Sequence, residues 1–172
     1  QILFTKPGDT YTYIDTVNTE KEQLCYTVIT LDSCLNATPS DTFCAIQLKG
    51  RPMNLSNFTD WTPFRGYPID SYAVLYYHNS SWDTLTKVKG ADTAYLNAPL
   101  QCNVPVTYRI KGAEKGGSRT TFSDTLILTP YDTTRPKPPP FSYATVLNGS
   151  QIMLYWQYSP DKDVKDYEIQ AR

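Results

Sequence analysis

The sequence predicts an all-β protein built from repeated β-sandwiches. Among its 172 residues, 14 are Tyr and 13 are Pro, and Thr is also frequent. Tyr, Thr, Val and Ile suit a pleated, half-buried surface, whereas Pro marks strand edges and turns. No segment carries the i, i+3, i+4, i+7 apolar spacing of an amphipathic helix over a useful length. Short strands with turn signals at even intervals are typical of a sandwich or barrel.

A pair of aromatic residues recurs at one spacing. Trp61 is followed by Tyr72 and Trp156 by Tyr167, so both pairs span eleven positions (72 − 61 and 167 − 156), with a Pro-containing turn between. A repeated spacing of this kind indicates a tandem array. We expect each pair to contribute to the core of its own sandwich.

A second repeat runs out of phase with the first. Tyr13 and Tyr26 have the same spacing of thirteen positions as Tyr95 and Tyr108. Each pair is followed by a Ser-Asp-Thr triplet, at 40–42 and at 123–125. Because the two repeats are out of phase, we expect the chain to be a piece of the array that is cut inside a sandwich at both ends.

Residues 50–131 are predicted to form one complete sandwich. Turn clusters rich in Asn, Ser, Asp and Gly separate its candidate strands. Within 106–112, alternation places Tyr108 and Ile110 on the inner face. The strands are expected over 54–61, 71–77, 82–88, 93–97, 106–112 and 124–128.

The flanks are predicted to be partial sandwiches, so the whole chain holds one complete and two partial modules. Residues 1–49 correspond to a C-terminal half, with Tyr26 and Val28 facing inward. Residues 132–172 correspond to an N-terminal half, and 136–140 form a stiff polyproline connector. The expected flanking strands cover 10–15, 24–31, 42–48, 152–156 and 167–171.

Half a sandwich leaves an apolar face and a strand edge uncovered. We therefore expect the parent chain to continue in both directions, or another molecule to pair with the open halves. Head-to-tail completion between chains would be one form of such pairing, and open contacts of that kind build filaments.

The charge balance excludes several classes of partner. The chain has 16 Lys and Arg against 17 Asp and Glu, so it lacks the excess of basic residues that would predict nucleic-acid binding.

No stretch approaches the roughly 18 apolar residues of a membrane span. The first residues lack the basic region of a signal peptide, so we expect targeting signals, if any, to lie outside this segment.

Three of the four cysteines, Cys25, Cys34 and Cys44, lie in one expected hairpin. This grouping suits an exported protein with a local disulfide. The CxxC-like spacing and the fourth ligand of a zinc site are missing. We expect Cys34 to pair with Cys44, since a tight hairpin could bring them together, and Cys102 to remain unpaired.

The aromatic pattern resembles that of fibronectin type III domains, which are immunoglobulin-like β-sandwiches. It consists of Trp61 on the second strand, Tyr72 at the start of the third, and Leu100 before Tyr108. The partial modules carry the matching Trp156, Tyr167 and Tyr26. The resemblance covers nearly the whole chain and implies a fold, but it specifies no activity.

A narrower resemblance is to the large, type IX-secreted, gliding-motility-associated surface proteins of Bacteroidetes. It rests on LCYTV at 24–28, LDSCLN at 31–36, SDTFC at 40–44, LTPYD at 128–132, and PDKDV at 160–164 before Tyr167. The resemblance implies an extracellular, cell-surface location.

Candidate catalytic and metal residues are few. His78 is the sole histidine and lies in a turn, where a solvated side chain accounts for it better than a catalytic triad does. Asp161, Asp163 and Asp166 could begin a calcium site, although a solvated turn is the simpler interpretation. We expect no catalytic residues and no cofactor.

Tyr76, Tyr77 and Trp82 surround one strand pair and could stack on sugar rings or contact a protein. Cross-strand packing of the sheet is the alternative that we favour. Since side chains alternate along a strand, Tyr76 and Tyr77 cannot both lie on the same face.

Two sets of glycan acceptors are possible. Sequons would mark surface positions in a eukaryotic secreted protein, and Asp-Thr pairs resemble the O-glycosylation motif of exported Bacteroidetes proteins. Asp-Thr is also a common start to a strand. The sequon residues are Asn36, Asn54, Asn57, Asn79 and Asn148; the threonines are Thr16, Thr84, Thr93 and Thr125.

Together these observations predict a non-enzymatic, structural and adhesive segment of a long surface protein, with a bacterial gliding or adhesion-associated adhesin as the specific expectation. Expected partners are neighbouring domains of the same chain, surface polysaccharide, other cells, or the secretion and motility machinery. An accessory module of a polysaccharide-degrading enzyme and a eukaryotic receptor ectodomain remain the alternatives, because a shared fold does not decide function.

Overall fold

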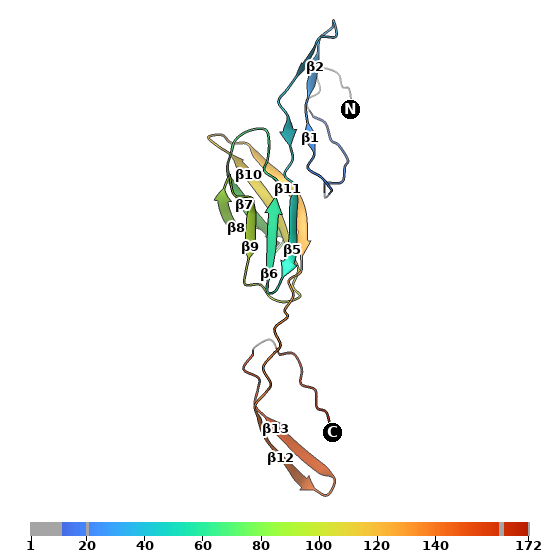
Figure 1. Ribbon diagram of the computed structural model, residues 1–172, viewed down its shortest axis with the longest axis vertical. Coiled ribbons are helices and arrows are strands. Elements are labelled where there is room, and N and C mark those ends of the chain that lie inside the picture. The colour runs from blue at the N-terminus through green and yellow to red at the C-terminus, as the bar shows by residue number, and fades with distance from the viewer. Residues whose placement is uncertain (1–11, 20, 162–163, 172) are drawn as a thin grey trace. The chain divides into compact units, whose positions relative to one another are not determined.

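The computed structural model describes residues 12–19, 21–161 and 164–171, and every regular element in this part is a β-strand (Figure 1). The all-β prediction is therefore confirmed. The chain divides into two compact units, Gln1–Tyr131 and Asp132–Arg172. The first unit contains a sandwich and the strands that precede it.

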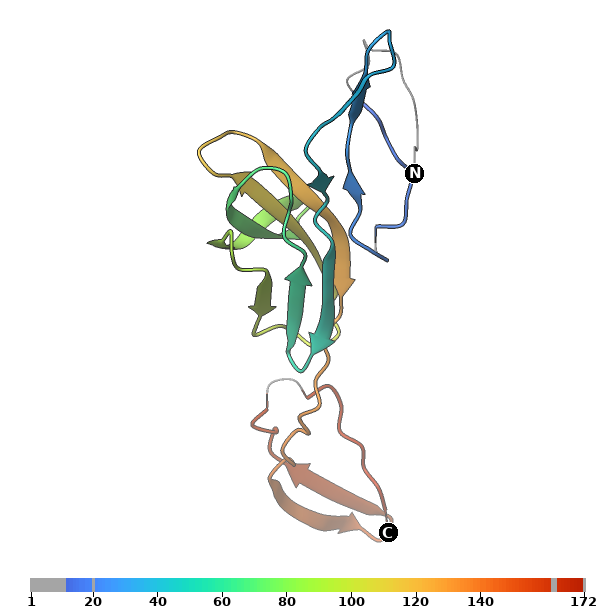
Figure 2. The same cartoon turned by 45° about the horizontal axis from the view of Figure 1, so that its top comes forward.

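Two antiparallel sheets form the sandwich of the first unit. One has the order β5-β6-β9 and the other the order β11-β10-β7-β8. Figure 2 shows the β5–β6 and β10–β11 hairpins in separate layers. The strands are β5 (Leu48–Met53), β6 (Ser56–Trp61), β7 (Ile69–His78), β8 (Ser81–Lys89), β9 (Ala94–Asn97), β10 (Val106–Glu114) and β11 (Thr120–Leu128).

The core lies between these two sheets because alternate residues of each strand point inward. Tyr108 and Ile110 of β10 are fully buried, on the face where alternation predicts them. Both sheets contribute to one apolar cluster, which comprises Ile46, Leu48, Trp61, Tyr72, Val74, Tyr108, Ile110 and Leu128.

The strand expected over 42–48 is wrong. The chain instead forms β4 (Phe43–Cys44) and then starts β5 at Leu48, whose side chain belongs to the sandwich core. Pro52 is accommodated in β5 because this strand is the edge of its sheet, where the missing amide of a proline breaks no ladder hydrogen bond.

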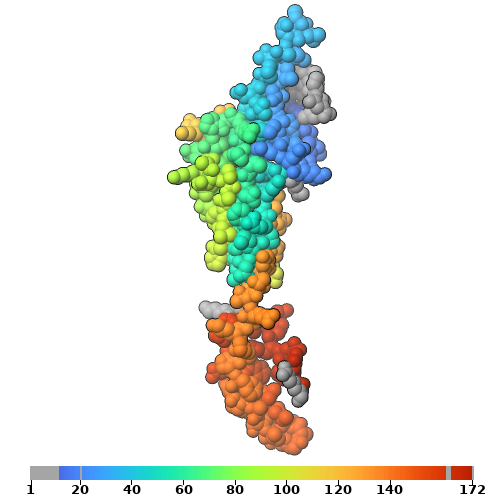
Figure 3. Space-filling model, viewed as in Figure 1, coloured from blue at the N-terminus to red at the C-terminus, as the bar shows by residue number. Residues whose placement is uncertain are grey.

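Among the described residues, four short strands precede the sandwich: β1 (Cys25–Tyr26), β2 (Ile29–Leu31), β3 (Ala37–Pro39) and β4. β1 pairs with β4, and β2 pairs with β3. Residues 27–43 are exposed throughout. Figure 3 shows most of this segment extending beyond the sandwich, although the ring of Phe43 lies 6.4 Å from that of Phe64.

The predicted disulfide between Cys34 and Cys44 is wrong, because Cys44 is bonded to Cys25. The β1–β4 register places Cys25 directly opposite Cys44. Cys34 lies exposed in the turn between β2 and β3, where its amide donates a hydrogen bond to the Asp32 carboxylate. Cys102 is also a free thiol, as expected.

The second unit contains one antiparallel hairpin, β12 (Phe141–Asn148) with β13 (Gln151–Trp156). Of the strand expected over 10–15, residues 10 and 11 lie outside the described residues, and 12–15 lie outside any strand, as do residues 167–171 of the other expected strand. No strand ladder of the described residues includes either segment.

Candidate functional site

Trp61 and Tyr72 meet inside the sandwich. Their rings contact edge to face, with centroids 5.7 Å apart at an interplanar angle of 69°. The Tyr72 hydroxyl accepts a hydrogen bond from the amide of Phe64 at 2.9 Å. Burial raises the pKa of Tyr72 above its usual range. This contact fixes the turn between β6 and β7 to the core.

Trp156 and Tyr167 make the same contact in the second unit. Their ring centroids are 5.8 Å apart at 63°, and the Tyr167 hydroxyl accepts a hydrogen bond from the Ser159 amide at 2.7 Å. Phe64 and Ser159 occupy the same position, three residues after the tryptophan. The repeated sequence spacing is therefore accompanied by repeated geometry.

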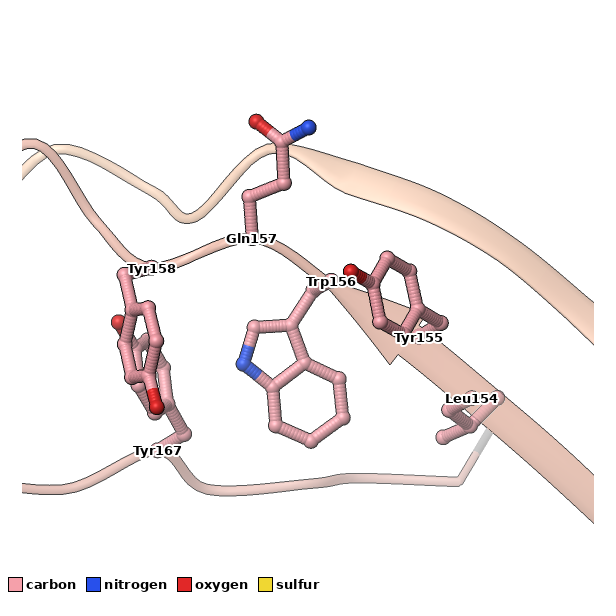
Figure 4. Close-up of a pocket in the computed structure, with 6 residues that line it drawn as sticks. All are labelled: Leu154, Tyr155, Trp156, Gln157, Tyr158 and Tyr167. Atoms are coloured by element: carbon pink, nitrogen blue, oxygen red, sulfur yellow. The ribbon is translucent and has the colours of Figure 1, made fainter.

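Here, however, the aromatic pair borders an open concavity of about 570 Å³. Figure 4 shows the Trp156 ring projecting from the strand toward Tyr167. The other residues around the concavity are Leu154, Tyr155, Gln157 and Tyr158.

Tyr108 and Tyr26 form a second matched set. The Tyr108 hydroxyl accepts hydrogen bonds from the side-chain amides of Asn97 (2.9 Å) and Asn57 (3.0 Å). The Tyr26 hydroxyl donates one to the Asp15 carboxylate at 2.9 Å. Burial and the bond to Asp15 raise the pKa of Tyr26. The roles of Asp15 and Asn97 were not predicted from the sequence, although each lies eleven positions before its tyrosine, and this shared spacing was a visible signal.

The Ser-Asp-Thr triplets form a third matched set. The Ser123 hydroxyl accepts a hydrogen bond from the Ile110 amide (2.9 Å) and donates one to the carbonyl of the next residue (2.6 Å). Likewise, the Ser40 hydroxyl accepts a hydrogen bond from the Val28 amide (3.0 Å) and donates one to the carbonyl of the next residue (2.8 Å). In β10 and β11 this serine lies where the strand register shifts. The same pair of serine hydrogen bonds therefore recurs at both triplets.

Aromatic and cationic side chains gather on the outer face of the four-stranded sheet. Tyr77 and Trp82 are direct cross-strand partners with ring centroids 5.3 Å apart. The Arg109 guanidinium lies 4.5 Å from the centroid of Phe122 and 6.0 Å from that of Trp82. The Lys111 ammonium lies 5.8 Å from Phe122. We call these five residues the outer-face patch.

Tyr76 is not part of this patch, because alternation turns it to the other face. Its ring stacks on His78, with centroids 5.7 Å apart at 22°. His78 is exposed at the end of β7, and its backbone carbonyl accepts a hydrogen bond from the Ser81 hydroxyl. The imidazole lies in a solvent-exposed hairpin end.

Two of the three candidate calcium ligands, Asp161 and Asp166, have separate partners. Asp161 accepts a hydrogen bond from the amide of Lys137, and Asp166 lies 3.9 Å from the ammonium of Lys165. Asp163 lies outside the described residues. Within the described part of the chain, no three His, Cys, Asp or Glu side chains form a group that could hold a metal ion.

The glycan candidates occupy different surroundings. Thr16, Thr84 and Thr125 are exposed, whereas Thr93 is half-buried. Asn79 is exposed in the β7–β8 turn with a φ of 47°. The Asn36 amide donates a hydrogen bond to Asp32 at 2.7 Å. The Asn57 sequon is inaccessible in the folded state, because that side chain is fully buried beside Tyr108.

The strands before β5 meet the sandwich along a shallow groove of about 360 Å³. The Thr19 hydroxyl donates a hydrogen bond to the Asp124 carboxylate across it. This bond and the amide of Thr125 hold the pKa of Asp124 below its usual range. The groove is a contact between two parts of the same compact unit.

Comparison with known proteins found no matching family model and no matching curated protein. The described part of the chain contains no helix with the length and apolar character needed to cross a membrane.

Proposed function

We propose that this chain is a non-catalytic structural and adhesive segment of a long extracellular protein, built from tandem fibronectin III-like sandwiches. The recurrence of whole contact sets carries the proposal. The contacts among Trp61, Tyr72 and the Phe64 amide lie in the first half of the sandwich sequence, and equivalent contacts recur in the unit after the sandwich. The contacts of Tyr108 with Asn97 and of Ser123 at its bulge lie in the second half, and equivalent contacts recur in the residues before the sandwich.

Two further observations support an extracellular, load-bearing role. The Cys25–Cys44 disulfide suits an oxidising compartment. The Pro-rich segment 136–140 suits a stiff spacer between modules. With the resemblance to type IX-secreted Bacteroidetes proteins, these features favour a gliding or adhesion-associated adhesin. Neighbouring modules, surface polysaccharide, other cells and the motility machinery are its proposed partners.

Pulling a single chain by tags at its two ends tests the structural role. We expect one cooperative unfolding step of about 300 Å, since the residues from 48 to 131 extend by roughly 3.6 Å each. Reducing the Cys25–Cys44 bond should leave the length of this step unchanged, because the bond lies before β5. A gradual extension without a discrete step would contradict the proposal.

Binding to immobilised acidic polysaccharide tests the adhesive role of the outer-face patch. Trp82→Ala should weaken binding about tenfold or more, because truncating an aromatic anchor at an interface commonly removes over 1 kcal/mol. Tyr131→Ala is the matched control, since Tyr131 is an exposed aromatic outside the patch. Equal retention of both variants and the unmodified chain would exclude the patch as the binding surface.

A further inference from the structure

The outer face of the four-stranded sheet carries charge of one sign. From the Trp82–Tyr77 pair to the Lys89–Ser71 pair, the outward-facing ladder positions hold four cations and no Asp or Glu. The chain as a whole has a net charge of −1, so positive charge is concentrated on this face. The four cations are Lys87, Lys89, Arg109 and Lys111.

Carboxylates of the protein do not pair with these four cations. Within the described residues, the ion pairs involve Arg119 and Lys165, neither of which belongs to the set. The outer face of the three-stranded sheet differs, because there Lys49 lies directly opposite Asp60 in the β5–β6 ladder. The unbalanced charge is therefore a property of one sheet.

Arg109 is held in place with part of its guanidinium still available. Its Nε donates a hydrogen bond to the Ser123 carbonyl (3.1 Å), and the guanidinium carbon lies 4.5 Å from the centroid of the Phe122 ring. Its two Nη groups donate no hydrogen bond to any described residue. A planar pair of N–H donors matches the two oxygens of a carboxylate.

Lys87 and Lys111 stand on either side of Ala73 in one row of the sheet. Ala73 is only 8% exposed, although it faces outward and lies outside the core cluster. Long lysine side chains cover apolar surface with their stems and keep their ammonium groups in water. This row therefore presents two charges above a small apolar surface.

Aromatic rings border the cations on the same face. Tyr77 is 50% exposed and Phe122 is 41% exposed, and the half-buried ring of Trp82 contacts that of Tyr77. Such rings offer flat apolar surface with low conformational entropy, which suits the faces of sugar rings. The face thus combines what an anionic sugar needs, namely cations for its charge and rings for its carbon skeleton.

We propose that this face binds a polysaccharide whose sugar rings carry carboxylates, that is, a polyuronate. The carboxylates pair with Arg109, Lys87 and Lys111, and the sugar rings pack on the exposed aromatic side chains. The inference rests on the proposed adhesive function and names the ligand class that the outer-face patch accepts.

The spacing of the cations favours a polyuronate over a nucleic acid. Lys87 and Lys111 are separated by one intervening strand, so their Cα atoms lie about 10 Å apart. Duplex DNA carries one charge per roughly 1.7 Å and requires a much denser array of cations. A polymer with one charge per sugar ring matches the sparser array. The Cys25–Cys44 disulfide also suits a compartment where extracellular polysaccharide is present.

The residues before the sandwich limit the binding surface at β11. The groove that they form with the sandwich is bordered by Phe122, Asp124 and Glu22. The charge of Asp124 acts on Arg109, and this carboxylate already accepts a hydrogen bond from the Thr19 hydroxyl. Both carboxylates repel an anionic polymer, so the ligand lies across β10, β7 and β8.

Comparing polygalacturonate with its methyl ester tests the role of the carboxylates. The ester keeps the same sugar rings but removes their charge. We expect the full chain to bind the ester at least tenfold more weakly, and binding of the acid form to weaken as salt is raised, because salt screens exposed charges. Equal affinity for the two polymers, or no binding of either, would overturn the inference.

Neutralising two lysines tests which cations act. Lys87→Gln with Lys111→Gln should lower the affinity for polygalacturonate about tenfold or more. Lys49→Gln with Lys115→Gln is the matched control, since it makes the same charge change at exposed lysines outside this face. Melting of the central sandwich checks that both variants fold, and exposed Lys87→Gln alone should give a partial loss. Equal losses in the two double variants would refute binding at this face.

Competition with single-stranded DNA tests the alternative occupant. We expect DNA to displace polygalacturonate at least tenfold less effectively per charge, because its charges are more closely spaced than the cations of the face. Equally effective displacement would reassign the face to nucleic acid and would contradict the inference.

Failure of this inference is distinguishable from failure of the proposed function. If Trp82→Ala weakened binding of the methyl ester and the acid form alike, and both forms bound equally, the adhesive role would stand without carboxylate recognition. If neither polymer bound, the 300 Å unfolding step would still report on the structural role by itself.

Discussion

Replacing Trp61 with alanine should lower the free energy of unfolding of the central sandwich by about 3–5 kcal/mol. The indole is buried among Tyr72 and the residues of both sheets, so truncation leaves a cavity that a close-packed core cannot fill. Its Nε1 has no hydrogen-bond partner among the described residues. The loss is therefore one of packing and dispersion. Urea denaturation followed by near-ultraviolet circular dichroism measures it.

The matched control is Trp156→Ala. Trp156 makes the same edge-to-face contact with its own tyrosine, but it is half-exposed and belongs to the second unit. The sandwich transition should move by no more than about 0.5 kcal/mol in this variant. Equal losses in the two variants would mean that the units unfold together, contrary to the division at 131/132.

Replacing Tyr108 with phenylalanine should destabilise the sandwich by about 1–3 kcal/mol. The variant keeps the buried ring and removes only the hydroxyl that accepts hydrogen bonds from Asn57 and Asn97. The Asn97 amide then loses its partner in the core, while Asn57 still reaches the carbonyl of Leu128 at 3.3 Å. Chemical denaturation gives the size of the loss, and faster amide exchange in β9 and β10 would locate it.

Tyr26→Phe is the corresponding control. It removes the same kind of hydroxyl, but the freed Asp15 carboxylate is only half-buried and can be solvated by water. We expect a change of at most about 0.5 kcal/mol in the sandwich transition. If Tyr108→Phe lowered the free energy of unfolding no more than Tyr26→Phe does, the hydrogen bonds of the Tyr108 hydroxyl would not contribute to the stability of the sandwich.

The features that recur at a fixed spacing, namely the aromatic pairs and the alternation of side chains along strands, could be predicted from the sequence. The spacing of Trp61 and Tyr72 led to both aromatic pairs, and alternation in β10 separated the inward Tyr108 and Ile110 from the outward Arg109. The polar partners were missed. Asn57 was read as a glycan acceptor, yet it is buried against Tyr108, because local sequence cannot show which hydroxyl lies across a core.

The sequence by itself determined the all-β architecture, the inward face of Tyr108 and Ile110 in β10 and the recurrence of the aromatic pairs, because these depend on spacing along the chain. Only the tertiary structure decided that Cys44 bonds Cys25 and not Cys34, since that choice depends on the register between strands distant in sequence. It also decided that Ile110 is buried while Val28 is exposed. Both residues were expected to face inward, but Val28 lies outside the strands of the described residues, whereas Ile110 lies in β10 beneath a second sheet.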